Sequence, residues 1–335
     1  MELLRFSNAP ALLCCAAVGG EKEGEGPLGP KFDHIDTADG RFGAPTWEQA
    51  EGEMQRLALS AALDKAGKER YPDALFAGDL MNQCTASSYG LSSFSLPYFG
   101  LYGACSTGCE GMILAAIALQ SGLFDRLGVV TSSHNSAAER QFRLPIEYGG
   151  QRSPTAQWTV TAAAAFLLSG KSESGMAYLT EALPGRIVDG GITDLTNMGA
   201  AMAPAAIDTL TRYFTLSGHS PTDFDLILTG DLGYEGVGIV RDLMGKQGFD
   251  LSRNFTDCGL LIYDRQRQDV HAGGSGCGCS TAVLAADLLP RLARGELRDI
   301  LWMGTGALMS PLTVNQGLSI PAICHLIRFT KECML

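Results

Sequence analysis

A cysteine at the start of a predicted helix is the residue of this sequence best placed to do chemistry. Residues 103–112 read GACSTGCEGM and run into the apolar stretch ILAAIALQSG, so Cys105 lies on a glycine-bracketed turn where a helix begins. The helix dipole lowers the pKa of a thiol there, and free backbone N–H groups can bind an oxyanion. Cys105, with Ser106 beside it, is therefore a candidate nucleophile or ligand contact. A buried cysteine at a tight turn is the alternative.

A run of polar side chains follows the predicted strand LGVV. Residues 131–143 read TSSHNSAAERQFR and bring hydroxyls, an imidazole, amides and guanidiniums just past the strand end. Arg140 would offer a bidentate fork to a carboxylate, and His134 would add a donor near neutral pH. The run predicts an anion site, with a solvated polar loop as the alternative. The residues that we assign to this side of the site are Ser132, Ser133, His134, Asn135, Arg140 and Gln141, with Tyr148 of the following loop as a further lining residue.

A second glycine-rich helix start lies at the matching place of a repeated pattern. GACSTGC at 103–109 corresponds to GGSGCGCS at 273–280. Loops at the carboxyl ends of parallel strands build the sites of open α/β sheets, so we expect both loops to face one cleft. Ser275 and Cys277 of the second loop therefore join the predicted site.

The repeat also predicts the fold class. LFAGDL at 75–80 is echoed by ILTGDL at 227–232, and in both regions buried strands alternate with helix-like stretches. This alternation indicates an α/β protein built of βαβ units with a largely parallel sheet. Two similar halves, residues 1–174 and 175–335, would pack as a pseudo-dimer.

Three segments illustrate the expected elements. Residues 47–67 and 202–218 are predicted helices, and residues 9–20, APALLCCAAVGG, are a predicted buried strand. A signal peptide or lipoprotein anchor at 9–20 is disfavoured, because a basic start is missing and the bulky Leu13 precedes Cys14. No apolar run, this one included, reaches the length of a membrane span.

Composition excludes several classes of function. The net charge of −11 and the lack of a basic run argue against a nucleic-acid binder. The 10 cysteines show no zinc-like spacing, and we read them as reduced thiols that mostly fill the core. We therefore expect no protein-bound metal and no cofactor.

The motifs carry a family resemblance. ACSTG around Cys105, the duplicated halves and GTGALMSP at 304–311 resemble the thiolase and ketoacyl-synthase superfamily, in which this cysteine accepts an acyl group. The segments AGDLMNQ, TSSHNSAAERQFRLPIEYGGQ and GGSGCGCS are more closely similar to the stage V sporulation protein AD family. The similar segments extend from residue 26 to residue 311.

That resemblance implies a thiolase-like fold of αβαβα layers and a binding function. Members of the family bind dipicolinic acid, with calcium as its chelate, and act in its uptake into developing endospores. The implied partners are other stage V sporulation membrane proteins of the same system. The implied location is cytoplasmic in origin and peripheral on the spore inner membrane, and the implied assembly is a homodimer.

The residues themselves argue against acyl transfer. Condensing enzymes pair the cysteine with acid/base groups from the second half. Asp231 stands where such a histidine is expected, and Ser275 or Cys277 stands where a second base is expected. We therefore predict a binding protein without catalytic activity. The alternatives are an acyltransferase that uses Cys105 with His134 or His271, and an adaptor with a vestigial pocket.

Overall fold

Ten strands of one sheet carry the fold and run in the order β11-β10-β13-β14-β9-β2-β8-β6-β4-β5. The computed structural model describes residues 3–142 and 151–333. Strands of the first half are β2 (Ala11–Gly19), β4 (Ala74–Gly78), β5 (Tyr98–Leu101), β6 (Arg126–Ser133) and β8 (Ala162–Ser169). Strands of the second half are β9 (Ala177–Leu183), β10 (Leu226–Thr229), β11 (Phe255–Asp257), β13 (Asp299–Ala307) and β14 (Ala322–Thr330). The short strands are β1 (Leu4–Arg5), β3 (His34–Ile35), β7 (Trp158–Thr159) and β12 (Gly274–Ser275).

The two halves have the same strand topology. In the first, β4 pairs in parallel with β5 and β6, whereas β8 pairs antiparallel with β6 and β2. In the second, β10 pairs in parallel with β11 and β13, whereas β14 pairs antiparallel with β13 and β9. The halves meet where β2 and β9 pair antiparallel. The sheet is thus mixed, and the prediction of a largely parallel sheet is wrong, because β8 and β14 run back against their neighbours.

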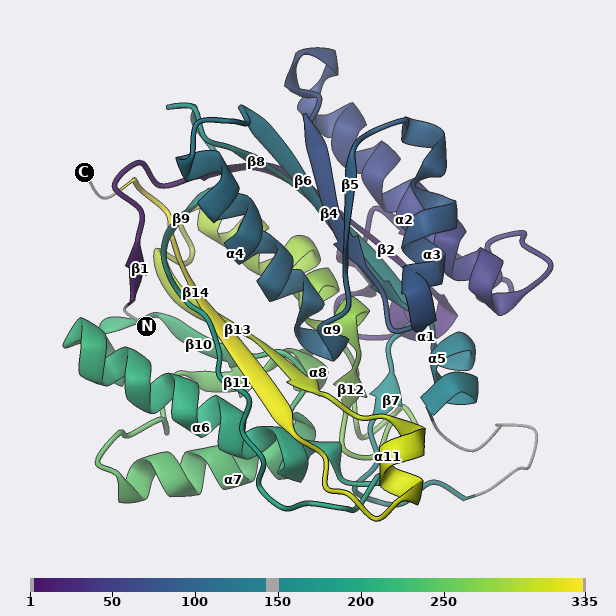
Figure 1. Cartoon of the computed structure of the whole chain (residues 1–335), viewed down its shortest axis with the longest axis vertical. Helices are drawn as coiled ribbons and strands as arrows, with labels where there is room; N and C mark the ends of the chain where they lie inside the picture. The colour runs from purple at the N-terminus through teal and green to yellow at the C-terminus, as the bar shows by residue number, and fades with distance from the viewer. Residues whose placement is uncertain (1–2, 143–150, 334–335) are drawn as a thin grey trace.

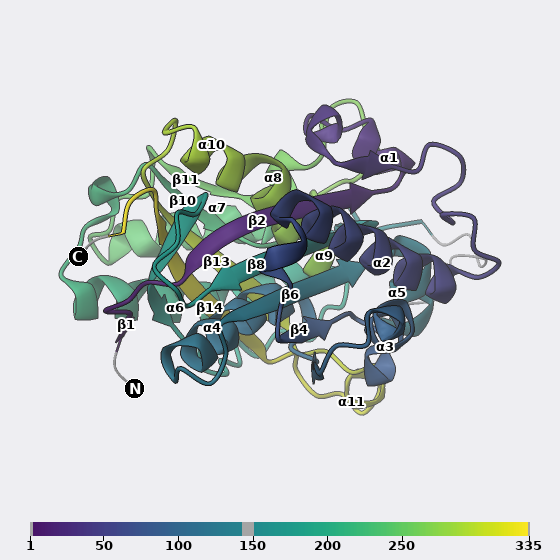
Figure 2. The ribbon, with the colours of Figure 1, turned by 90° about the horizontal axis from the view of Figure 1, so that it is seen from above.

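Helices form three layers around these strands (Figures 1 and 2). The first half is covered on its outer face by α2 (Trp47–Ala66), and the second by α6 (Met198–Ser217), against which α7 (Gly233–Lys246) packs. Between the halves lie α4 (Thr107–Gln120) and α9 (Cys277–Val283). The remaining helices are α1 (Glu21–Gly24), α3 (Thr85–Gly90), α5 (Asn135–Phe142), α8 (Cys258–Leu261), α10 (Leu289–Ala293) and α11 (Pro311–Asn315), with a π-helical turn at Leu284–Leu288.

Local sequence signals set the ends of the two long outer helices. The side chain of Thr46 accepts a hydrogen bond from the Gln49 N–H at the start of α2, and Asn197 does the same for the Ala200 N–H at the start of α6. Gly67 and Gly218, both with positive φ, end them. Side-chain N-caps and left-handed glycines are common helix boundaries. Both helices are therefore confirmed, and α6 starts four residues before its predicted range.

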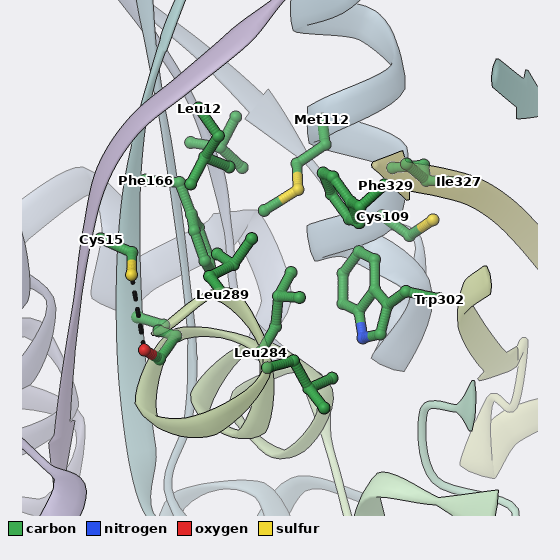
Figure 3. Close-up of a cluster of buried hydrophobic side chains, with 14 of the residues drawn as sticks. Leu12, Cys15, Cys109, Met112, Phe166, Leu284, Leu289, Trp302, Ile327 and Phe329 are labelled. Carbon is green, nitrogen blue, oxygen red and sulfur yellow. Dashed lines mark hydrogen bonds between the residues drawn. The ribbon is translucent and has the colours of Figure 1, made fainter. Parts of the chain in front are cut away.

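The central layer forms one apolar core between the halves (Figure 3). Phe166 of β8 and Met112 of α4 are fully buried there, as are Trp302 of β13 and Phe329 of β14. Burying side chains of this size contributes on the order of 2 kcal/mol each. Separate cores lie under α6 and under α2. None of the helices in residues 3–142 and 151–333 has the length and hydropathy needed to cross a bilayer.

Candidate functional site

A cavity of about 250 Å³ lies between the two glycine-rich loops and draws its lining from both halves. The first half contributes the turn at Ala104–Ser106, α5, the end of β7 and the segments that follow β4 and β5. The second contributes the start of α6, the residues before α9 and the end of β13. The lining residues are Leu80, Tyr102, Ala104, Cys105, Ala138, Glu139, Phe142, Thr159, Met198, Ser275, Gly276, Ala307, Leu308 and Met309. The expectation that both loops face one cleft is therefore met for Cys105 and Ser275.

Backbone geometry presents Cys105 to the cavity. Ala104 has a φ of 52°, a left-handed conformation that costs on the order of 1 kcal/mol for a residue with a Cβ. It opens the short 3₁₀ turn that precedes α4. Beside it, Ser106 is buried, and its hydroxyl donates to the Gly103 carbonyl at 2.7 Å. Ser106 therefore braces the turn and does not face the cavity.

Asp231 lies beneath Cys105 and connects the two loops. The residue is buried, and its carboxylate accepts hydrogen bonds from the Gly276 N–H at 3.1 Å and the Thr305 hydroxyl at 2.6 Å. The Cys105 thiol lies close enough to the same carboxylate to interact with its charge. Burial raises the pKa of Asp231 to about 6, against the lowering effect of these bonds. Asp231 is therefore largely ionised at neutral pH.

The thiol of Cys105 is protonated, contrary to the expectation drawn from its helix. Burial raises the pKa of Cys105 well above its usual value, and the charge of Asp231 and the neighbouring Cys277 add to the effect. The helix dipole is worth about 0.3–1 kcal/mol at most surface sites, which is too little to offset a desolvated thiolate beside a carboxylate. The prediction of a lowered pKa is wrong.

The hydroxyl and amide side chains of the polar run form hydrogen bonds inside the protein. Ser132 donates to Glu51 Oε1 at 2.8 Å, and Ser133 donates to the Val160 carbonyl at 2.7 Å. The Asn135 amide donates to the Thr159 carbonyl at 3.3 Å. These residues are buried but do not line the cavity, so the structure does not bring their side chains to Cys105.

His134 also faces away from the cavity. Its Nε2 bonds the Gly40 carbonyl at 2.9 Å, its Nδ1 accepts from the Ser136 N–H at 3.2 Å, and its ring packs on Trp47. Nε2 therefore carries the proton, because a carbonyl can only accept. Burial lowers the pKa of His134, so it is neutral at pH 7 and fixes the 40–47 loop.

The last residues of the run lie on the outer side of α5, a helix that the residue pattern alone did not indicate. Arg140 forms an ion pair with Glu48, and Gln141 accepts a 3.4 Å hydrogen bond from the Asn82 N–H. Tyr148 lies outside the described residues. The opposite side of α5 lines the cavity with Ala138, Glu139 and Phe142. Phe142 follows Glu139 by three residues and Ala138 by four, and this helical spacing is the sequence signal that could have predicted the cavity-facing side of α5.

Cys277 and His271, the two other candidates of the second half, lie in different surroundings. Cys277 is fully buried in a small apolar cluster with Leu80, Ala138 and Cys105. His271 lies on the surface, where Nδ1 bonds the Ser153 carbonyl at 2.7 Å and Nε2 is 3.1 Å from Asp269. His271 does not line the cavity, so the structure does not pair it with Cys105.

The described lining contains no lysine, arginine or histidine. Its polar groups are the hydroxyls of Tyr102, Thr159 and Ser275, the thiol of Cys105 and the carboxyl group of Glu139. The Glu139 carboxyl group accepts a hydrogen bond from the Thr159 hydroxyl at 3.0 Å. In the part of the chain that the structure describes, no group of three or more His, Cys, Asp or Glu could hold a metal ion. The arrangement can enclose a small, mostly apolar ligand, but it offers the thiol no histidine base.

Comparison with known proteins places this site in a family. The model of the family "Stage V sporulation protein AD" matches residues 2–330. The chain belongs to this family. It is 41% identical over 313 residues to stage V sporulation protein AD of Bacillus subtilis (strain 168), which covers 93% of this chain and 91% of that protein.

Solved structures show the fold of this family member to be thiolase-like. The acetyl-CoA acetyltransferase of Syntrophomonas wolfei matches with a TM-score of 0.62 at 10% identity, over 97% of this chain and 100% of that one. The 3-oxoacyl-(acyl carrier protein) synthase III of Pseudomonas aeruginosa PAO1 matches with a TM-score of 0.55 at 16% identity, over 98% of this chain and 99% of that one. The predicted thiolase-like fold is thus confirmed, whereas the activities of these enzymes are their own.

Proposed function

We propose that the chain binds dipicolinic acid in the cavity between its halves and acts without acyl transfer in loading developing endospores. The family resemblance points to this ligand. The observation that carries the non-catalytic part is the burial of the Cys105 thiol beside the Asp231 carboxylate, because burial and then the negative charge raise the pKa of the thiol and keep the sulfur protonated. A condensing enzyme needs the opposite, an activated thiolate.

The dimensions of the cavity support a single-ring ligand. Pockets for drug-sized ligands span roughly 300–1,000 Å³, and this cavity of about 250 Å³ lies just below that range. Phe142 and Met309 offer apolar walls for a flat ring, and Ser275 offers a hydroxyl for a carboxylate oxygen. Calcium would enter as part of the chelate, with no protein-bound metal required.

Two experiments test this function. Calorimetric titration with dipicolinate, with and without calcium, should give one saturable site that persists in Cys105→Ser. Incubation with radiolabelled acetyl-CoA should leave Cys105 unacylated. A thioester on Cys105 that forms and turns over would instead support the acyltransferase alternative.

We further propose a homodimer that lies peripherally on the spore inner membrane with other stage V sporulation membrane proteins. The edge strand β5 supports the dimer, since it is one of the two terminal strands of the described sheet and carries the exposed Tyr98 and Phe99. An open edge with apolar side chains favours pairing with another strand. Light scattering should give a dimer mass for the native chain and a monomer mass for Phe99→Asp.

A further inference from the structure

A shielded negative charge lies behind the lining of the cavity. Asp231 is 1% exposed; its carboxylate accepts hydrogen bonds from the Gly276 N–H and the Thr305 hydroxyl, and the Cys105 thiol interacts with its charge. Cys105 and Gly276 both line the cavity. The carboxylate therefore neighbours two residues that a ligand in the cavity would contact.

The titratable groups around Asp231 provide no positive charge. Among the described residues, the groups that interact with the charge of Asp231 are five thiols and one further acid. Burial raises the pKa values of these thiols. Glu139 adds another carboxyl group on the cavity wall. The thiols and the further acid are Cys105 from the 3₁₀ turn, Cys277 and Cys279 from α9, Cys258 from α8, Cys324 from β14 and Asp257 at the end of β11. An anion that enters the cavity thus meets like charge without a counterion from these groups.

We propose that Asp231 couples the binding of an anion in this cavity to the uptake of one proton. An anion next to Cys105 raises the free energy of the ionised carboxylate, because like charges are poorly screened in a buried site. A proton from solvent removes this repulsion, and the carboxyl group keeps its bonds to Gly276 and Thr305. The inference takes its ligand from the proposed function, but the charge argument applies to any anion that enters.

The coupling has a definite direction. Burial already raises the pKa of Asp231 to about 6 in the free chain, and a bound anion raises it further. Affinity for the anion should therefore increase about tenfold per unit fall in pH between the free and the bound pKa, and level off below pH 6. A chain with this property loads its ligand at the more acidic pH and releases it at the more alkaline one.

Calorimetry in two buffers counts the proton. Dipicolinate, which does not itself titrate between pH 6 and pH 8, is titrated at pH 7.5 in phosphate and in Tris, which differ in ionisation enthalpy. The native chain should take up close to one proton per ligand, and Asp231→Asn close to none. Asp250→Asn serves as the matched control, because Asp250 is an exposed acid that does not line the cavity, so the variant should keep the proton uptake. Binding by the native chain without proton uptake would overturn the proposal.

Alkylation of Cys105 tests the same coupling without dipicolinate. Iodoacetate is anionic and iodoacetamide is neutral. The rate of Cys105 alkylation by iodoacetate divided by the rate by iodoacetamide is independent of the thiolate fraction, so this ratio reports only the exclusion of anions. In the native chain this ratio should rise as pH falls from 8 to 6, and Asp231→Asn should raise it severalfold at pH 8. Cys333, which is partly exposed, is the internal control. A ratio at Cys105 independent of pH and of Asp231 would overturn the coupling; a changed ratio without dipicolinate binding would support it and contradict the proposed ligand.

Discussion

Asp231 and Cys105 come from different halves of the repeat, and the buried Asp231 carboxylate lies beside the Cys105 thiol that lines the cavity. Asp231 follows β10 and Cys105 precedes α4, so this contact joins the second half to the first. Burial and the charge of Asp231 together explain why a cysteine kept on the turn of an acyl-transferring fold is protonated. A protonated thiol is a poor nucleophile.

The first prediction concerns this contact. Asp231→Asn removes the negative charge beside the sulfur, so the pKa of Cys105 should fall toward its usual value. The pH profile of Cys105 modification by iodoacetamide, followed by mass spectrometry, measures that midpoint. Cys333 should give the same profile in both chains. An unchanged Cys105 midpoint would show that burial alone sets its pKa.

The second prediction is a pH dependence of stability. Burial raises the pKa of Asp231 to about 6 and of Asp257 to about 7, above their value near 4 in the unfolded chain. The folded state therefore binds more protons between pH 4 and pH 7, and the contribution of each acid to stability is lost as the pH rises through that window. For Asp231 the loss is on the order of 3 kcal/mol. Urea unfolding at pH 4.5 and pH 7 should show a smaller pH difference in Asp231→Asn than in the native chain.

The third prediction concerns the core between the halves. Phe166→Ala removes a fully buried ring that packs between β8 and the central helices, and it should lower the free energy of unfolding by about 3–5 kcal/mol. Leu123→Ala is the matched control, because Leu123 is 81% exposed and should change stability by less than about 0.5 kcal/mol. Equal losses in the two variants in urea unfolding would contradict this assignment of the core.

The fourth prediction compares two helical glycines. A Cβ on Gly278 at the start of α9 would lie 2.3 Å from the Ala162 carbonyl oxygen, whereas a Cβ on Gly245 in α7 meets nothing within 4 Å. Gly278→Ala should therefore destabilise the chain and weaken ligand binding, since it displaces the loop that carries Ser275 and Gly276. Gly245→Ala should stabilise it by about 1 kcal/mol. Thermal unfolding of both variants measures the difference, and a neutral Gly278→Ala would refute the close approach.

The outer helices were predictable because their signals are local. Thr46 and Gly67 bound α2, and Gly218 ends α6, at positions that the sequence marks by residue type. The mixed sheet was not predictable in the same way, because an all-buried strand such as β8 reads alike whether its neighbours are parallel or antiparallel.

The site was predictable at its glycine-rich turns and not along the polar run. Residue types at 132–141 indicate donors, but the partners that engage them, Glu51 for Ser132 and Gly40 for His134, are far away in sequence. The prediction of a lowered pKa for Cys105 was wrong for the same reason. The helix start is local and visible, whereas its burial and the approach of Asp231 depend on the packing of the two halves.

Dipicolinate binding by a chain whose cavity has been filled tests the central claim most directly. Ala138 lines the cavity from α5 and is buried, so Ala138→Phe places a ring where the ligand should lie, and Leu123→Phe is the surface control. We expect saturable calorimetric binding to the native chain and to Leu123→Phe, with a loss of at least tenfold in affinity for a folded Ala138→Phe. Equal affinity in all three chains would contradict it, because the ligand would then bind elsewhere.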